Sequence, residues 1–517
     1  MSIFDSMRET MIKLWNERPL RLILFLALFF RLLAVVFSKG YGMHDDHFLV
    51  IESSQSWVDG YDYNDWLPSS NNGKINPSGH SFTYCGLHYL FFSGLRSIGI
   101  TDAQTKMYFV RLLHALLSLL VVYYGYRITE KLAGMRTART AGLLLALYFF
   151  MPMLSVRNLV EMACIPFLLY PAWMVIERDE KLSPLLWLLA GLILGFAFNI
   201  RFQSILFTAG FGLALLLRKK WMGAILTGVG FLVCAAGVQG ITDTIIWGQP
   251  FVEFKEYVKY NMENAAAYST KAWYMYFTVL GGLLIPPVSL FLLFGFFRSW
   301  KKYLLLFLPS FVFFAFHSYF PNKQERFILP IFPFVIILGM IGWNEFIAAS
   351  SFWEKRKRML RGCWIFFWIL NCIPLFFISV AYSKRNKVEP MSWLSEKGDV
   401  KGFIVENGDS PDQPLMPMYY LERWVHEFYV NRDVSPAAFA DMMKITDDKL
   451  KPNYVIFVNA ENIDVRVSKM RTVFPEMKYL ATVEPSFIDK VMHWLNPKNN
   501  QNVTCYIYSI LIPTGKG

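Results

Sequence analysis

The sequence predicts a polytopic α-helical membrane protein of about eleven transmembrane helices, followed by a C-terminal extracytoplasmic α/β domain. First, 55% of the residues are hydrophobic and 17% are charged, whereas soluble globular chains have about 45–50% apolar and about 25% charged residues. Second, apolar stretches that are long or nearly long enough to cross the hydrocarbon layer recur between residues 20 and 382. Third, residues 383–517 mix charges with short runs typical of strands.

The first apolar stretch is expected to remain in the protein as a membrane anchor. It is too long, and its flanks have too few small residues, for a cleaved signal peptide. An odd number of spans places the two termini on opposite sides of the membrane. The expected spans cover residues 20–38, 109–126, 140–154, 158–176, 184–199, 203–217, 222–240, 275–297, 303–320, 326–349 and 362–382.

The positive charges predict which side faces the cytoplasm. The net charge of +12 comes from Lys and Arg in short runs between apolar stretches, which is typical of topological charges and not of a nucleic-acid-binding face. With eleven spans, all of these runs fall on one side, which is therefore the cytoplasm. They are Arg8, Lys13, Arg18 and Arg21; Arg127, Lys131, Arg136 and Arg139; Arg218, Lys219 and Lys220; Arg298, Lys301 and Lys302; and residues 355–358 with Arg361.

The opposite, extracytoplasmic side receives two long loops, at residues 39–108 and 241–274, and the C-terminal tail. Within the first loop, residues 82–99 are aromatic and apolar, which predicts an amphipathic helix in the membrane interface. We therefore expect a transmembrane domain over residues 1–382 and an α/β domain over residues 383–517, with strands near 454–458 and 506–512.

The six cysteines give no motif for a metal or a redox site, because neither CxxC nor metal-ligand spacing occurs. Four lie in apolar runs and are expected to be core residues. Cys85 and Cys505 would form a disulfide only if the fold brought them together.

An acidic pair directly follows the first span. Asp45 and Asp46 lie between His44 and His47. Such a pair can serve as a general base, bind a metal ion or cap a helix N-terminus, and the residues alone leave these alternatives open.

Several further ionisable residues fall on the same predicted face. A charge at membrane depth costs several kcal/mol unless it faces a cavity or a partner, so their gathering predicts a charged cavity at membrane level. They are Arg157 and Glu161, Arg201, and the group His317, Lys323, Glu325 and Arg326.

Each of these residues also has a purely structural interpretation. Arg157 and Glu161 could form an i,i+4 helix pair, and the turn from Lys323 to Arg326 could be an interfacial anchor. Their concentration on one side of the membrane, together with the acidic pair, favours a functional site.

Transfer of a sugar from a lipid phosphate fits this combination of groups. The phosphate leaves without a general acid but needs cations to stabilise its charge, and Arg and Lys supply them. The incoming hydroxyl needs one base, either Asp45 or Asp46, and a single displacement inverts the anomeric centre. The donor must be lipid-linked, because nucleotide sugars are made in the cytoplasm.

Four stretches resemble the family 22 glycosyltransferases, polytopic mannosyltransferases of the C-type fold that use dolichyl-phosphate mannose. They occur in the family's order over roughly residues 20–340. The stretches are residues 44–48, similar to His-Pro-Asp-Glu-x-Phe; Asp243 with residues 247–248 and 260–261, similar to Asp, Tyr-Gly and Asn; residues 272–277, similar to Pro-Trp-x-Trp-Tyr-Phe; and residues 317–318 with 323–328, similar to His-Lys-Glu-x-Arg-Phe.

The chain also departs from this family pattern. Asp46 replaces the usual Glu, Asn322 replaces a His, Gln324 separates Lys323 from Glu325, and the Thr-Trp-Glu motif is reduced to residues 64–66. These departures predict a distant relative that uses a polyprenyl-phosphate sugar. We expect it in a bacterial inner membrane with a periplasmic site or, alternatively, in the endoplasmic reticulum with a luminal site.

The resemblance implies roles for the candidate residues. Asp45 is the expected base and Asp46 assists it, while Arg201, Lys323 and Arg326 bind the donor phosphate. Glu325 positions Arg326 or Lys323 or binds a sugar hydroxyl, and Trp273 stacks on a sugar or lies in the interfacial aromatic belt. The remaining substrate-binding candidates are His44, His47, Arg157, Glu161 and His317. No cofactor and no metal are expected, although His44, Asp45 and His47 could hold a metal ion.

The expected partners are thus the lipid-linked sugar donor, a glycan or lipid-linked acceptor and membrane lipids, with no nucleic acid. Three other functions compete with this prediction. A transporter or flippase would also bury charges, but they would lie at the midplane between inverted repeats, which the sequence lacks. A ligase of the same fold would move a whole glycan, and an assembly factor would need no aspartate base.

Overall fold

The computed structural model describes residues 3–267, 269–498 and 500–511. Over these residues the chain forms two compact units. The first unit comprises residues 3–36, 56–91 and 109–380, and the second comprises residues 37–55, 92–108 and 381–511.

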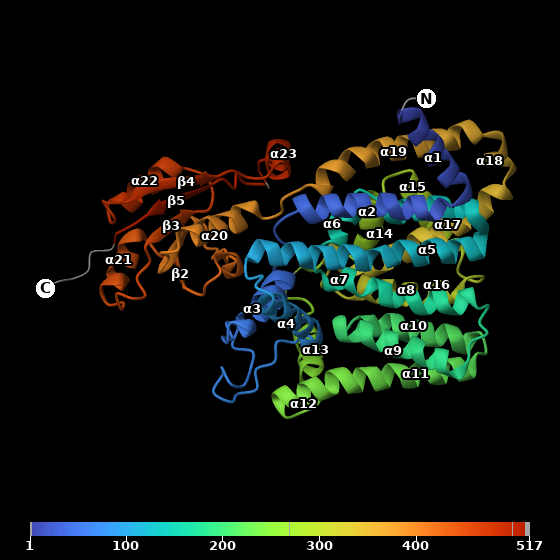
Figure 1. Ribbon diagram of the computed structural model, residues 1–517, viewed down its shortest axis with the longest axis horizontal. Helices are drawn as coiled ribbons and strands as arrows, with labels where there is room; N and C mark the ends of the chain where they lie inside the picture. The colour runs from blue at the N-terminus through green and yellow to red at the C-terminus, as the bar shows by residue number, and fades with distance from the viewer. Residues whose placement is uncertain (1–2, 268, 499, 512–517) are drawn as a thin grey trace. The chain divides into compact units, whose positions relative to one another are not determined.

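The first unit is a bundle of apolar helices whose long members run side by side (Figure 1). Helix α9 packs against α8 and α11, α10 packs against α16, and α15 packs against α17. The elements are α1 (Ile3–Glu17), α2 (Pro19–Phe37), α5 (Ala103–Leu147), α6 (Met151–Ser155), α7 (Val160–Ala163), α8 (Ile165–Glu177), α9 (Pro184–Ile200), α10 (Ser204–Leu217), α11 (Trp221–Ala235), η2 (Ala236–Gly240), α12 (Ile241–Trp247), α13 (Val252–Glu263), α14 (Met275–Leu283), α15 (Val288–Arg298), α16 (Leu304–Tyr319), η3 (Glu325–Ile331), α17 (Phe332–Ala348), α18 (Ser351–Lys355) and α19 (Lys357–Ser379).

Glycines allow α15 and α17 to approach closely. A Cβ atom on Gly295 would lie 2.0 Å from the carbonyl oxygen of Gly339, and one on Gly342 would lie 2.2 Å from the carbonyl oxygen of Gly295. No side chain fits at these positions, so the two backbones pack directly, as small residues permit in membrane helices.

The described residues contain six helical segments long and apolar enough to cross a membrane, and four shorter apolar helices. The predicted span 109–126 and the first part of the predicted span 140–154 lie in the 45-residue helix α5, which is interrupted where Gly134 adopts φ 77°, and the span 140–154 continues into α6. The predicted span 275–297 is divided between α14 and α15 by residues 284–287. The protein is thus an integral membrane protein of many helices, and the number eleven stays a prediction.

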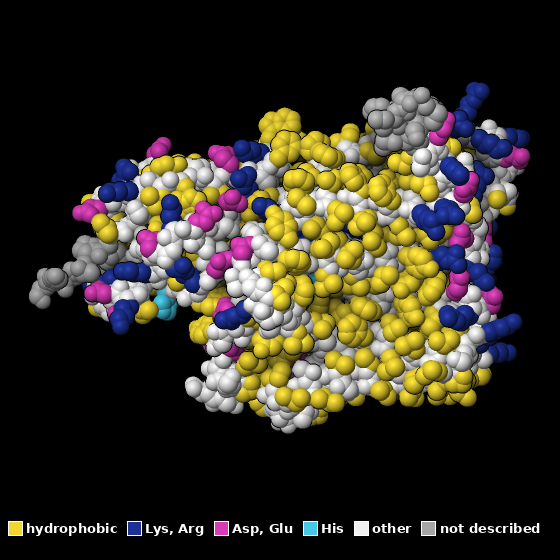
Figure 2. Space-filling view, viewed as in Figure 1, with side chains coloured by type: hydrophobic (Ala, Val, Ile, Leu, Met, Phe, Trp, Pro, Cys, Tyr) yellow, Lys and Arg dark blue, Asp and Glu magenta, His cyan; other side chains and the backbone are white. Residues whose placement is uncertain are grey.

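Charged side chains gather at one end of the helical bundle, while hydrophobic side chains cover its visible flank (Figure 2). The loops predicted to face the cytoplasm carry ion pairs, including Arg127 with Glu177 at 2.7 Å and Lys302 with Glu345 at 2.6 Å. Partners of this kind neutralise part of the positive charge without removing the excess of Lys and Arg.

The second unit contains a five-stranded mixed sheet, counted over the described residues, in the order β2-β1-β3-β5-β4 (Figure 1). Strands β1, β2 and β3 are parallel, with Ile404 opposite Phe428 on one side and Val455 on the other. Strand β5 pairs antiparallel with β3 and β4. The elements are α20 (Arg385–Lys397), β1 (Gly402–Glu406), η4 (Met418–Leu421), β2 (His426–Val430), α21 (Pro436–Lys444), β3 (Tyr454–Phe457), α22 (Ile463–Arg471), β4 (Lys478–Val483), α23 (Phe487–Leu495) and β5 (Cys505–Ser509).

Burial of both faces of the central strands β1 and β3 explains why these continuous apolar runs form strands. Ile404, Val455 and Phe457 pack against Phe439 of α21 and Met470 of α22 in one apolar core. The strands predicted at 454–458 and 506–512 correspond to β3 and β5, and residue 512 lies outside the described residues.

The long first loop contributes to both units. Its elements are η1 (Asp46–Glu52), α3 (Ser53–Val58) and α4 (Phe82–Ser97), and α4 corresponds to the helix predicted at 82–99. Residues 37–55 and 92–108 belong to the second unit, whereas residues 56–91 belong to the first. All six cysteines are free thiols.

Candidate active site

The acidic pair lies at the start of η1, a π-helical turn in the second unit. Asp45 is the N-cap residue with φ −59° and ψ −45°, and among the described backbone groups its side chain accepts no capping hydrogen bond. The helix-cap interpretation of Asp45 is therefore wrong, because a capping residue normally has extended backbone angles that turn its oxygen toward the first free N–H groups.

The two aspartates differ in exposure. The side chain of Asp45 is 42% exposed and lies 3.7 Å from the imidazole Nδ1 of His44. Asp46 is buried, with 3% of its surface exposed. A partly exposed carboxylate can meet a substrate hydroxyl, whereas a buried one is better suited to orienting its neighbours.

His47 fixes the acidic segment within the second unit. Its buried ring stacks on Tyr41 and on Tyr420 of η4, with ring centroids 4.5 and 5.5 Å apart. Its Nε2 lies 3.6 Å from Oε1 of Glu52, which also accepts a hydrogen bond of 2.9 Å from the backbone N–H of Tyr419. The complete burial of His47 favours this positioning role over the predicted contact with substrate.

The first unit contains a separate group of charged residues, the cationic cluster, defined as Arg157, Arg201, Lys323 and Arg326 with the carboxylate of Glu161. Oε1 of Glu161 lies 2.6 Å from Nη1 of Arg201 and 3.9 Å from Nε of Arg326. Arg201 also donates to the backbone carbonyl of Phe327 at 3.3 Å. Helix α7, which carries Glu161, packs against η3, which carries Arg326.

The i,i+4 interpretation of Arg157 and Glu161 is wrong. Helix α6 ends at Ser155 and α7 begins at Val160, with Leu159 extended at ψ 123°. Because the intervening residues are not helical, the two side chains do not lie one turn apart on a single helix. Glu161 instead pairs with Arg201 from the turn after α9.

A short backbone pairing positions Lys323. Its N–H donates to the carbonyl of Ser269 at 3.0 Å, next to an antiparallel bridge between Thr270 and Asn322. Its Nζ donates to the carbonyl of Phe320, and burial lowers the pKa of the Lys323 ammonium. His317 lies within electrostatic reach of both Arg201 and Lys323, so Lys323 belongs to the same neighbourhood as the Arg201 pair.

Two predicted side chains lie at the surface instead of within this cluster. Glu325 is 65% exposed and forms an ion pair with Lys271 at 3.7 Å. The carboxylate found beside Arg326 is that of Glu161, at 3.9 Å, and a role of Glu325 in positioning Arg326 or Lys323 stays a prediction. Trp273 is 66% exposed and contacts Tyr274 edge to face, an arrangement compatible with either of its predicted roles.

Sequence reasoning missed a buried carboxylate, Glu253, that anchors the first loop. Its Oε2 accepts hydrogen bonds from Gly79 N–H at 2.7 Å and from the Ser78 hydroxyl at 3.1 Å, and its Oε1 accepts one from the Trp247 indole at 3.1 Å. Burial raises the pKa of Glu253 to about 7. A glutamate flanked by Val252 and Phe254 was the available sequence signal.

The predicted site residues thus form two groups. His44, Asp45, Asp46 and His47 belong to the second unit, and the cationic cluster with His317, Glu325 and Trp273 belongs to the first. Their convergence on one chamber stays a prediction. Over the described residues, no group of three or more His, Cys, Asp or Glu side chains is arranged to hold a metal ion.

Comparison with known sequences identifies similar proteins. Residues 22–397 match the model of the Alg9-like mannosyltransferase family. The human alpha-1,2-mannosyltransferase ALG9 is 24% identical over 298 residues, which cover 54% of this chain and 48% of that protein. The mannosyltransferase APTG1 of Arabidopsis thaliana is 23% identical over 414 residues, covering 75% of this chain and 73% of that protein. The match thus spans about half the length of the human relative.

Comparison with solved structures shows the fold. ArnT from Cupriavidus metallidurans, bound to undecaprenyl phosphate, superposes with a TM-score of 0.59 at 13% identity, covering 94% of this chain and 97% of ArnT. The oligosaccharyltransferase of Archaeoglobus fulgidus superposes with a TM-score of 0.51 at 12% identity, covering 85% of this chain and 68% of that protein. The predicted C-type membrane glycosyltransferase architecture is confirmed.

Proposed function

The chain belongs to the Alg9-like mannosyltransferase family, and from this premise we propose that it is a membrane glycosyltransferase. It moves one mannose-like sugar from a polyprenyl-phosphate donor to a hydroxyl group of a glycan or lipid-linked acceptor. The reaction inverts the anomeric configuration and takes place on the extracytoplasmic face of the membrane.

The cationic cluster is the observation that carries this proposal. Two of its cations, Arg201 and Arg326, lie beside the carboxylate of Glu161, and Arg157, Arg201 and Lys323 are each no more than 3% exposed. A gathering of buried arginine and lysine side chains supports an anionic ligand, because charged side chains at membrane depth mark substrate sites. A lipid phosphate meets this requirement, and arginines can bind its oxygens in pairs.

Asp45 is the proposed general base. Its carboxylate takes the proton of the acceptor hydroxyl while the hydroxyl oxygen attacks the anomeric carbon of the donor. The bond between this carbon and the phosphate oxygen breaks, and the phosphate leaves with the electron pair. Arg201, Lys323 and Arg326 stabilise the charge that develops on the phosphate. One displacement with one base inverts the anomeric centre.

The proposed site faces away from the cytoplasm, in the periplasm of a bacterial inner membrane or, as the alternative, in the lumen of the endoplasmic reticulum. The excess of Lys and Arg in the loops of the opposite side supports this orientation. A single cysteine introduced at Ile445, which is 88% exposed, should react with a membrane-impermeant maleimide from outside the cytoplasm. A cysteine at Lys219 should be protected, and the reverse pattern would overturn the orientation.

The function is tested with the full-length protein in liposomes and a panel of polyprenyl-phosphate sugars with candidate acceptors. We expect the acceptor to gain the mass of one hexose with inverted anomeric configuration, and nucleotide sugars to be inactive as donors. Transport of labelled lipid without a glycosylated product would contradict the proposal. A mass gain of many sugars would identify a ligase instead.

A further inference from the structure

A polar cavity of about 620 Å³ opens at the carboxyl ends of the parallel strands in the second unit. The chain leaves β1 toward β2 at one edge of the sheet, and after β3 it continues through α22 toward β4 at the other edge. Neighbouring strands whose connections diverge in this way create a crevice, and ligands of open α/β sheets bind in such crevices.

The cavity is lined by the loops that follow all three parallel strands. Its volume is in the range of small-molecule sites. The lining residues are residues 406–410 after β1, 430–432 with Ser435 and Pro436 after β2, 459, 461 and 462 after β3, Val465, Arg466 and Lys469 of α22, and Gln501.

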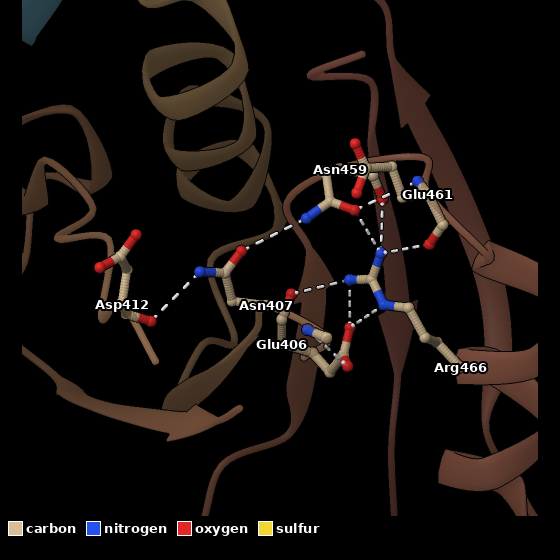
Figure 3. Close-up of polar contacts among 7 residues, drawn as sticks. Glu406, Asn407, Asp412, Asn459, Glu461 and Arg466 are labelled. Atoms are coloured by element: carbon tan, nitrogen blue, oxygen red, sulfur yellow. Dashed lines mark hydrogen bonds and ion pairs between the residues drawn. The ribbon is translucent and has the colours of Figure 1, made fainter. Parts of the chain in front are cut away.

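Arg466 connects residues that line this cavity into one hydrogen-bonded framework (Figure 3). Its guanidinium donates to the side chain and the carbonyl of Glu406 at the end of β1. It also donates to Asn459 Oδ1 at 2.6 Å and to the Glu461 carbonyl at 3.0 Å, both after β3. Asn459 in turn donates to Asn407, whose amide donates to the Asp412 carbonyl at 3.1 Å. The loops around the cavity are thus fixed before a ligand binds.

The lining chemistry favours a neutral, hydroxyl-rich ligand. Three acidic residues, Glu406, Asp409 and Glu461, balance three basic ones, Arg432, Arg466 and Lys469, and the Arg466 charge is engaged by Glu406. This balance disfavours a phosphate, which prefers an excess of arginine. The few apolar side chains, Val430, Pro436 and Val465, disfavour a lipid tail.

The remaining lining groups are mostly amides and hydroxyls, which both donate and accept hydrogen bonds. They belong to Ser410, Ser435, Asn462 and Gln501, and to Asn407, Asn431 and Asn459, whose amides also hold the surrounding loops. Sugar hydroxyls require the same dual capacity. We propose that this cavity is a saccharide-binding site, separate from the residues assigned to catalysis, that accommodates one or two sugar residues.

The test measures direct binding of mannobiose to the full-length protein in detergent by saturation-transfer NMR, without donor. Only the choice of a mannose disaccharide as probe rests on the proposed function. Val465→Trp and Lys469→Trp add bulk at exposed lining positions and should weaken binding at least tenfold. Ile445→Trp, at an exposed position outside the cavity, serves as the matched control and should bind like the wild type.

The outcomes separate this inference from the proposed function. Mannobiose binding that survives in Asp45→Asn and is weakened by both cavity variants supports the site. Binding unchanged by Val465→Trp and Lys469→Trp, or lost in Asp45→Asn alone, overturns it. Binding of inorganic phosphate in place of mannobiose, sensitive to the same variants, also overturns the saccharide assignment. Sugar transfer that proceeds in a protein without mannobiose binding refutes this inference alone.

Discussion

The acidic segment and the cationic cluster are fixed in opposite ways. Asp45 keeps 42% of its side chain exposed, and the segment behind it is fixed by ring stacking of His47 and a backbone hydrogen bond to Glu52. Arg201, by contrast, is almost completely buried and is fixed by a charged partner, Glu161. The comparison teaches that a proposed base and a proposed anion site need different surroundings.

The physical reason is that the base accepts a proton, whereas the cations stabilise negative charge on the leaving phosphate. A base has to exchange a proton with an incoming hydroxyl, so the acceptor must be able to reach it. Cations that stabilise a leaving phosphate act most strongly where water is excluded. Glu161 reduces the cost of burying Arg201, because the two side chains form an ion pair at 2.6 Å.

The largest expected effect on the rate of sugar transfer comes from a substitution in the acidic segment. Asp45→Asn should lower the transfer rate by about 10²–10⁴-fold, the usual contribution of a general base, because the amide cannot accept the acceptor proton. Initial rates at saturating donor and acceptor measure this effect. Asp46→Asn is the neighbouring comparison and should cost less. Full activity of Asp45→Asn would refute the base assignment.

The next largest effect is expected from substitutions in the cationic cluster. Lys323→Ala and Arg326→Ala should each lower kcat/KM for the donor by about 10²–10³-fold, the cost of removing one stabilising donor of charge. Lys271→Ala is the matched control, because Lys271 is 49% exposed and pairs only weakly with Glu325 at 3.7 Å. If only the KM for the acceptor changed, the phosphate assignment would be incorrect.

A third substitution tests whether the acidic segment depends on stacking. Tyr420→Ala removes the ring that stacks on His47 and should lower the free energy of unfolding by about 3–5 kcal/mol, as removal of a buried aromatic ring does. Activity should fall while donor affinity is retained. Tyr420→Phe keeps the ring and should restore activity, which thermal unfolding and rate measurements can compare. Equal losses in both variants would contradict a role for stacking.

The smallest effect concerns pH. Burial raises the pKa of Glu253 to about 7 from an ordinary value of 4.5. The folded state therefore binds the Glu253 proton more tightly than the unfolded state does. The contribution of this proton to the stability of the folded state is complete below pH 4.5 and is lost as the pH rises through about 7. The change should amount to at most about 3 kcal/mol and be visible in hydrogen exchange of residues 78–80. Glu253→Gln should abolish this pH dependence, and a slope unchanged in that variant would contradict it.

Local patterns were sufficient to predict many of the elements. Long apolar runs predicted the membrane helices, and short apolar runs rich in β-branched and aromatic residues predicted β3 and β5. The charges in residues 127–139 predicted a loop there, and the structure places the break in α5 within this stretch, at Gly134, which adopts a positive φ. The division of 275–297 into two helices was missed, although Pro286 and Pro287 at its centre are helix-breaking residues.

The partners of the site residues were harder to predict, since they are distant in sequence. Proximity in the chain suggested Glu325 for Arg326, whereas the structure supplies Glu161 from α7. Glu253 meets Gly79 across 174 residues, and Glu52 meets Tyr419 across 367. A single sequence gives no signal for such pairings, because each partner is determined by how the whole helical bundle and the sheet pack.

The separation of 367 residues between Glu52 and Tyr419 also has a consequence during biosynthesis. A ribosome adds about 5–20 residues per second, so roughly 20–70 seconds pass between synthesis of the acidic segment and synthesis of its aromatic partners. Once Arg326 has been added, the nascent chain contains the cationic cluster, but its acidic segment still lacks the contacts that fix it. The acidic segment therefore gains the contacts that fix it only after Tyr419 and Tyr420 have been added, later than all of the proposed catalytic groups.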